Sequence, residues 1–206
     1  MNDSSDVKTR VTFVRHGETE WNRTRRVQGV SDIPLSDVGR AQAQATARAL
    51  SSEKFTAVFT SPLGRAHETA QIISAHLGLG EPELLAGVIE RNYGAGEGLT
   101  DREIETRWPR HIAVPGRESR DAVVTRALTT LSDLSERFPR GRLLVVSHGG
   151  VIGSLTRHLT NQKVPAPGQA IFNGSVHHFV YENGELSLEK FNLVPLGDAL
   201  VESGGH

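Results

Sequence analysis

The feature that most constrains the fold is the alternation of short β-rich runs with segments of helical periodicity. Strand candidates lie at residues 11–14, 55–60 and 142–146, and helical patterns separate them. Strands that alternate with helices are typical of a mostly parallel sheet covered by helices on both faces. We therefore predict an α/β fold, a three-layer sandwich with a mixed sheet and a small lid segment.

Four helices are predicted between these runs. The first begins after Ser36, a good N-cap residue, and the second ends at Gly78, which suits a C-cap. The third follows residues 116–119, and the fourth covers residues 151–159. The apolar positions expected on the buried faces of the first three helices are Val38, Ala41, Ala45 and Ala49; Leu63, Ala66, Ala70, Ile73 and Leu77; and Val123, Ala127, Leu131, Leu134 and Phe138.

Two further regions complete the expected organisation. The β-rich runs 176–181 and 186–191 flank Asn183-Gly184, which predicts a hairpin at one edge of the sheet. Residues 80–116 lack a clear strand and are interpreted as a lid or lobe over one end of the sheet. We expect a single catalytic domain over residues 11–196, with disordered tails at 1–10 and 197–206.

Composition excludes several classes of protein. The chain has 206 residues, 23 basic and 24 acidic, so it lacks the basic excess typical of nucleic-acid-binding proteins. It contains no cysteine, which excludes disulfides and thiolate chemistry. No apolar run is long enough for a membrane span, and the N-terminal residues do not resemble a secretory signal. We expect a cytoplasmic protein with no nucleic-acid or membrane partner.

Charged or titratable groups follow each of the three strands. Arg15 and His16 end the first, Arg65 comes shortly after the second, and His148 ends the third. In open α/β sheets, ligands bind beyond the carboxyl ends of the strands. If the three strands are neighbours, two arginines and two histidines meet at one edge of the sheet.

Such a group of side chains suits a phosphate. Two guanidiniums about 4 Å apart repel by about 4 kcal/mol at an effective dielectric near 20, and a phosphate dianion relieves that repulsion. One neutral histidine can serve as a nucleophile, and the other can donate a hydrogen bond to phosphoryl oxygens. A leaving alkoxide needs a proton, for which Glu90 is the best candidate.

Each of these residues also has a structural interpretation. A single histidine at a strand end is more often structural, a single arginine is more often part of a surface ion pair, and Glu90 alone suits solvent. His177 and His178 alternate in a strand, so their rings point to opposite faces and are unsuited to joint metal binding. The functional interpretation therefore depends on the combination of residues.

Five motifs in order carry a resemblance to a known family. The stretches RHGETEWN, VQGVSDIPLSDVGRAQA, TSPLGRAHETA, IERNYGAGEG and VVSHGG resemble those of the histidine phosphatase superfamily, the phosphoglycerate-mutase-like group, over nearly the whole chain. The resemblance implies an α/β sandwich, phosphorylation of His16, and no metal or cofactor. It implies that Arg15, Arg65 and His148 clamp the phosphoryl group and that Glu90 is first the proton donor and then the base.

The resemblance also implies further contacts with the substrate. Asn22 and the Gly149 amide would lie close to the phosphoryl group, and Gln28 and Gly29 would line the substrate side. Arg91 and Tyr93, in a stretch that resembles the ERHYG pattern of the mutases, would contact an acidic substrate. Arg117 departs from the GGES pattern of many phosphatase relatives, so it either adds charge near the pocket or caps a helix.

Three functions remain open. The leading one is a metal-independent phosphomonoesterase for a small phosphorylated metabolite, because the interval from Glu90 to His148 is too short for the long mutase insertion. Gln28, where the mutases prefer a small hydroxyl residue, favours the same branch. The alternatives are a phosphoglycerate mutase with the same phosphohistidine chemistry and a catalytically silent phosphate-binding protein. We expect a monomer or homodimer.

Overall fold

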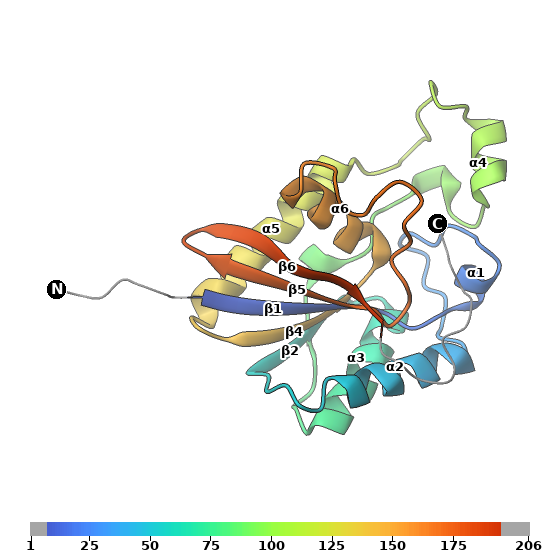
Figure 1. Ribbon diagram of the computed structural model, residues 1–206. Coiled ribbons are helices and arrows are strands. Elements are labelled where there is room, and N and C mark those ends of the chain that lie inside the picture. Colours follow the sequence, from blue (N-terminus) through green and yellow to red (C-terminus); the bar gives the residue numbers. More distant parts are fainter. Residues whose placement is uncertain (1–7, 195–206) are drawn as a thin grey trace.

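A mixed six-stranded sheet forms the centre of the molecule in the computed structural model, which describes residues 8–194 (Figure 1). The strand order is β3-β2-β4-β1-β5-β6, with β2, β4 and β1 adjacent and parallel. This arrangement confirms the predicted fold class. The strands are β1 (Lys8–Arg15), β2 (Ala57–Thr60), β3 (Glu83–Leu84), β4 (Arg142–Ser147), β5 (Val176–Glu182) and β6 (Glu185–Leu193).

Helices cover both faces of the sheet (Figure 1). On one face, α5 and α6 pack on Phe13, Val145 and Phe179. On the other, α2 and α3 pack on Val14 and Val146. The helices of the described residues are α1 (Glu20–Arg23), α2 (Asp37–Ala49), α3 (Gly64–Leu77), α4 (Asp101–Arg107), α5 (Arg120–Arg137) and α6 (Gly149–Leu159).

The helix ends follow the expected signals. The Ser36 side chain accepts a hydrogen bond from the Gly39 amide, and Ser119 accepts one from the Ala122 amide at the start of α5. Gly78 ends α3 in the left-handed conformation, with φ 67°. Asn183 and Gly184 both have positive φ, as the tight turn of the β5–β6 hairpin requires.

The predicted buried face of α2 is wrong by about one position. Val38 is 45% exposed, and Ala49 is also exposed. Gly39, Gln42, Ala43, Thr46 and Ala47 are buried instead. Polar partners explain the difference, since Gln42 accepts a hydrogen bond from the Glu18 amide and Thr46 donates one to the Gly174 carbonyl. The inner face of α2 therefore holds backbone segments beside the site rather than a purely apolar core.

Other boundaries also differ from the expected ones. β1 begins at Lys8, so residues 8–10 of the expected N-terminal tail belong to the sheet. β2 begins at Ala57 rather than at residue 55, and α6 begins at Gly149 rather than at residue 151. The 80–116 segment contains the two-residue strand β3 and the helix α4, where no clear strand was expected.

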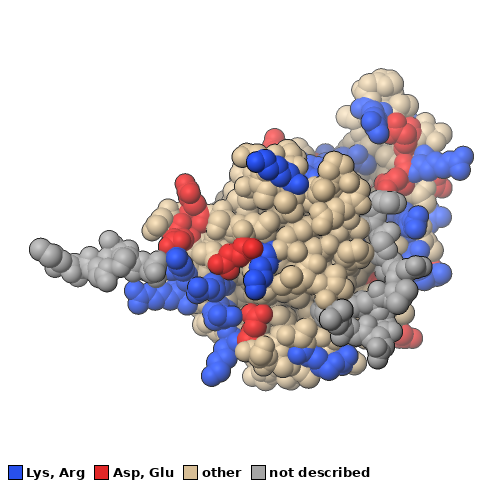
Figure 2. Space-filling model, viewed as in Figure 1, with Lys and Arg blue, Asp and Glu red and all other residues tan. Residues whose placement is uncertain are grey.

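Some expectations lie outside what the structure describes. Residues 1–7 and 197–206, which the sequence assigns to tails, and residues 195–196, which it assigns to the end of the catalytic domain, fall outside the described residues. None of the described helices is long and apolar enough to cross a membrane. On the face shown in Figure 2, Lys and Arg side chains stand among Asp and Glu side chains, in keeping with a formal net charge of −1.

Candidate active site

The parallel pairing of β1 and β4 brings the two predicted catalytic histidines together. Arg15 lies opposite Ser147 in the register, so His16 and His148 leave the sheet at the same level. The His16 amide donates to the Ser147 carbonyl at 3.0 Å. The two imidazole rings lie 5.1 Å apart between centroids. The convergence predicted from neighbouring strands is therefore confirmed.

The hydrogen bonds of His16 orient its ring. Nδ1 lies 2.6 Å from the Gly17 carbonyl oxygen, which can only accept, so Nδ1 carries the proton. Nε2 is then the unprotonated nitrogen, and its lone pair accepts from Arg65 Nε at 3.3 Å. Burial holds the pKa of His16 well below its usual value, and the charges of Arg65 and Arg15 add to that effect. The ring is therefore neutral, with Nε2 available as a nucleophile.

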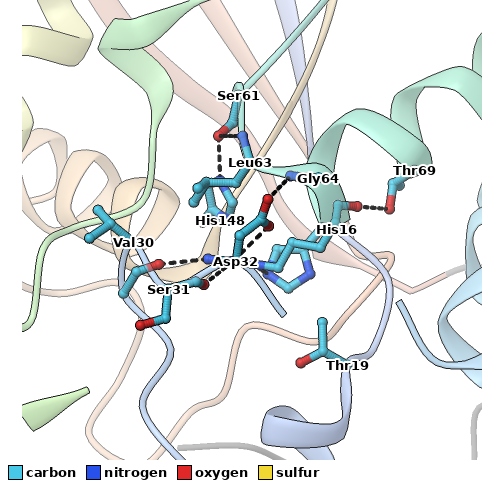
Figure 3. Close-up of polar contacts among 12 residues, drawn as sticks. His16, Thr19, Val30, Ser31, Asp32, Ser61, Leu63, Gly64, Thr69 and His148 are labelled. Carbon is cyan, nitrogen blue, oxygen red and sulfur yellow. Dashed lines mark hydrogen bonds and ion pairs between the residues drawn. The ribbon is translucent and has the colours of Figure 1, made fainter. Parts of the chain in front are cut away.

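Arg65 is completely buried in the first turn of α3 and is held from three sides. Besides its bond to His16, it donates to the Gly29 carbonyl at 2.7 Å and to the Ser31 carbonyl at 2.8 Å. Gly29 has φ 58°, and a Cβ there would overlap the Glu97 carboxylate. Asp32 Oδ2 accepts from the Gly64 amide at the start of α3 (Figure 3). The 28–32 loop thus fixes both the helix start and the guanidinium.

His148 stands behind His16 and is completely buried. Its Nε2 lies 2.7 Å from the Ser61 hydroxyl, which also accepts from the Leu63 amide (Figure 3). A hydroxyl that donates its single proton to Nε2 leaves the imidazole proton on Nδ1. That Nδ1 atom is buried and has no hydrogen-bond partner among the described residues. Ser61 therefore orients this ring from the end of β2.

Glu90 is 8% exposed and lies at the start of the lobe segment. Its two carboxyl oxygens accept hydrogen bonds from the Arg91 amide at 2.8 Å and the Gly150 amide at 3.1 Å. Burial raises the pKa of this carboxyl, although these two bonds and the charges of Arg65 and Arg15 act in the opposite direction. A protonated Glu90 can serve as a general acid above the usual range of a carboxyl group.

A pocket of about 780 Å³ opens over these groups. Ten of the eleven predicted site residues line it, and His148 lies behind His16. Asn22 completes the capping box of α1 with the N-cap residue Thr19 and accepts from the Asn173 side chain, while Arg91 lies over the Tyr93 ring. The ten lining residues are Arg15, His16, Asn22, Gln28, Gly29, Arg65, Glu90, Arg91, Tyr93 and Gly149.

Most unpartnered buried polar atoms of the described residues belong to this site. They are Arg15 Nε, Gln28 Oε1, Arg117 Nε and His148 Nδ1, and the fifth is the Thr156 hydroxyl. Buried polar atoms without partners are rare in native proteins, so three on residues that line one pocket, with a fourth on His148 behind His16, mark a place built to receive a polar ligand. Three of the four are nitrogen atoms, which indicates an anionic ligand.

Several residues of the site were not predicted. Asn173 donates to the His16 carbonyl at 2.9 Å, Ser61 orients His148, and the Gly150 amide holds Glu90. Ser61 and Gly150 lie within the quoted motifs, where they had no assigned role. Asn173 follows the last helix, in a loop with no pattern of its own. Arg117 also lines the pocket, and the N-cap of α5 is Ser119. Of the two interpretations of Arg117, added charge near the pocket therefore holds, and a helix cap does not.

The donor groups present do not suggest a metal site. Within residues 8–194, no group of three or more His, Asp or Glu side chains is arranged to hold a metal ion. The positive charge in the pocket is supplied by guanidinium groups, which bind phosphate oxygens through paired hydrogen bonds.

Comparisons with known proteins agree with this geometry. The chain is 38% identical to phosphoglycerate mutase-like protein 4 of Arabidopsis thaliana, over 98% of this chain and 92% of that protein. It is 30% identical to the uncharacterized phosphatase PhoE of Bacillus subtilis, over 90% of this chain and 95% of that one. A mycobacterial glucosyl-3-phosphoglycerate phosphatase matches the structure with a TM-score of 0.79 at 28% identity, over 89% of this chain and 98% of that one. Residues 11–194 match the model of branch 1 of the histidine phosphatase superfamily, and the chain belongs to that superfamily.

Proposed function

We propose that this protein hydrolyses the phosphomonoester of a small metabolite through a phosphohistidine on His16. The observation that carries the proposal is the orientation of His16, whose Nδ1–H donates to Gly17 while Nε2 faces Arg65. A neutral imidazole whose unprotonated Nε2 lies beside a fixed guanidinium is suited to attack a bound phosphate.

The phosphate would be bound by groups that already stand in place. Arg15 and Arg65, which line the pocket, supply two permanent positive charges. His148 lies behind His16, and with its proton on Nδ1 it would supply a further donor. Gly149 lies beside Arg15, and Asn22 is linked to the His16 carbonyl through the Asn173 side chain. Charge-assisted hydrogen bonds of this kind contribute roughly 1.5–3 kcal/mol each. Because backbone carbonyls hold both guanidiniums, those of Gly29 and Ser31 for Arg65 and that of Ile171 for Arg15, little reorganisation accompanies binding.

The first chemical step transfers the phosphoryl group to the enzyme. His16 Nε2 forms a bond to phosphorus as the ester P–O bond breaks, and the bonding electrons leave with the ester oxygen. Glu90 gives its proton to that oxygen, so the product departs as a neutral alcohol. The raised pKa of Glu90 keeps the proton available for this step.

The second step returns the enzyme to its starting form. Glu90, now a carboxylate, takes a proton from water, and the hydroxyl oxygen bonds to phosphorus as the N–P bond breaks. Inorganic phosphate leaves, and His16 recovers its neutral form. No metal or organic cofactor enters either step. The proposal includes two further predictions. Residues 80–116 act as a lid over the pocket, and the protein is a cytoplasmic monomer or homodimer.

A second candidate is a phosphoglycerate mutase reaction. Arg91 and Tyr93 line the pocket beside Glu90, where they are suited to bind an acidic substrate. The similarity to a phosphoglycerate mutase-like protein also favours the mutase reaction. Both candidates share transfer to His16 and differ only in whether water or a second hydroxyl accepts the phosphoryl group.

One experiment separates the two candidates. Phosphate release is measured for a panel of sugar phosphates, phosphoglycerates and other phosphomonoesters, in parallel with a coupled mutase assay with and without 2,3-bisphosphoglycerate. We expect phosphate release to exceed isomerisation of 3-phosphoglycerate. Isomerisation that outpaces release would replace the phosphatase proposal with the mutase one, and the absence of both activities would contradict each.

A further inference from the structure

The pocket carries far more positive charge than one phosphate requires. Nine arginines line it, against two carboxylates, Glu90 and Asp101, although the whole chain has a net charge of −1. Arg15 and Arg65 suffice to balance a phosphate dianion at the strand ends. The other guanidiniums therefore have another role, which depends on where they lie and what they contact.

Three of these arginines come from α5, α6 and the loop before α5. Arg117 lies in the loop before α5, Arg120 is the first residue of α5, and Arg157 is in the last turn of α6. Their charges influence one another and their neighbours, since Arg120 lowers the pKa of Arg157 and both Arg117 and Arg120 lower that of Arg91, in each case after the larger effect of burial. We call Arg117, Arg120 and Arg157 the outer arginine cluster.

The outer arginine cluster has no acidic partner within the described residues. None of the ion pairs in that part of the chain includes Arg117, Arg120 or Arg157. The nearby carboxylate of Glu118 is engaged by Arg126, at 2.8 Å and 3.1 Å. Arg117 Nε is buried without a hydrogen-bond partner. Like charges held together in this way are stabilised when an anion binds between them.

The Tyr93 ring connects this cluster to the catalytic end. Arg117 lies 5.7 Å from the ring centroid, and Arg91 lies 5.2 Å from it. The Tyr93 hydroxyl and the Glu90 carboxylate approach the same point, because a Cβ on Gly150 would lie 3.0 Å from the former and 2.4 Å from the latter. Arg117 of the outer arginine cluster therefore contacts the same aromatic ring whose hydroxyl lies near Glu90, the proposed proton donor.

We infer that the outer arginine cluster is a second anion subsite, which selects phosphomonoesters carrying another phosphate or a carboxylate on the leaving group. The inference rests on the proposed function for the identity of the first anion. The second anion belongs to the alcohol product, because the cluster lies beyond Glu90 rather than beside His16. Such a substrate spans the pocket, with one end at the strand ends and the other at the guanidiniums of α5 and α6.

A matched series of substrates tests the inference. Propyl phosphate has no second anion, 3-phosphonooxypropanoate adds a carboxylate, and propane-1,3-diyl bisphosphate adds a phosphate. We expect kcat/KM for each of the two compounds that carry a second anion to exceed that for propyl phosphate at least tenfold, mainly through a lower KM. In the double variant Arg120→Gln/Arg157→Gln this preference should fall about tenfold or more. Arg107→Gln on the exposed side of α4 should keep the wild-type preference.

Binding measurements separate failure of this inference from failure of the proposed function. Calorimetric Kd values for the three compounds are obtained with His16→Ala protein, which lacks the nucleophile. If a compound with a second anion binds at least tenfold more tightly than propyl phosphate, and the double variant loses this difference, the subsite is supported whether or not hydrolysis occurs. Equal Kd values would overturn the subsite, even for an active phosphatase. If the double variant does not fold, Arg120→Gln alone, at an exposed position, gives the same comparison.

Discussion

The two ends of the pocket are built in different ways. At the sheet end, His16, Arg65 and His148 are buried, and backbone carbonyls or a serine hydroxyl hold each of them. At the outer end, Arg117 and Arg157 are half-buried, Arg120 is exposed, and the bonds that hold them are few. Rigid elements thus fix the groups proposed for the chemistry, whereas longer and freer side chains are left for selecting the substrate.

The largest expected effect lies at the sheet end. Replacing His16 by alanine removes the proposed nucleophile, so we expect kcat to fall by roughly 10⁴-fold or more. His67→Asn, on the outer surface of α3, is the control and should retain wild-type turnover. Phosphate release is the measurement. Near-normal turnover of His16→Ala would contradict the role of His16 as the nucleophile, and with it the assignment of the chemistry to the sheet end.

Glu90 lies between the two ends, and its replacement shows which it serves. Glu90→Gln keeps one acceptor oxygen for the Arg91 and Gly150 amides, but it has no carboxyl proton to give to a leaving group. We expect turnover of propyl phosphate to fall by roughly 10²–10⁴-fold and turnover of nitrophenyl phosphate to fall much less, because nitrophenolate leaves without a proton.

The control for Glu90→Gln is Glu97→Gln, in the same lobe. Glu97 bonds to the Val30 and Ser31 amides and the Ser31 hydroxyl, which indicates a role in holding the loop. Its replacement should reduce the turnover of both substrates equally. Equal losses in Glu90→Gln would instead assign Glu90 to positioning.

The pH profile sharpens the same comparison. His16 must be neutral, and its pKa is lowered by burial, so activity should fall only on acidification well below the usual range of a histidine. Glu90 must be protonated, and its pKa is raised by burial, so activity on alkyl phosphates should fall as pH rises through that raised value. A kcat profile that keeps its alkaline limb in Glu90→Gln would contradict this assignment.

The smallest effect concerns the loop that supports Arg65. Asp32 accepts from the Gly64 amide at 2.9 Å, while Leu63, at the N-cap position, makes no capping bond with its side chain. Asp32→Ala should therefore lower the free energy of unfolding by about 0.5–2 kcal/mol, as loss of a helix cap does. Denaturant unfolding measures the change, and Asp37→Ala, within the first turn of α2, is a surface control.

The sheet end could be predicted from the sequence because its geometry follows from the backbone. Once residues 11–14 and 142–146 are recognised as parallel neighbours, Arg15, His16 and His148 must meet at one edge. The start of β1 differs from the prediction, because the strand begins at Lys8 rather than at residue 11. Lys8 and Arg10 lack the apolar character that marks the rest of β1, so the sequence pattern does not indicate a strand there. Pairing with β4 and β5 continues the strand past that point.

Other parts of the site could not be predicted, because they depend on tertiary contacts. The buried face of α2 contains Gln42 and Thr46, whose burial requires partners far along the chain. Asn173 reaches His16 from a loop without periodicity. Arg120 and Arg157 meet only because α5 and α6 pack side by side, and each looks like an ordinary surface arginine in its own helix. Side-chain convergence of this kind has no local signal.

The central claim is that the phosphoryl group passes through His16. The most direct test uses a substrate labelled with ³²P, quenched in alkali within the first turnover and digested with protease. The account predicts label on the peptide that contains His16, stable in alkali and lost in acid, and absent from His16→Asn protein. Label on a serine or on His148, or full turnover without any labelled protein in a single-turnover experiment, would contradict it.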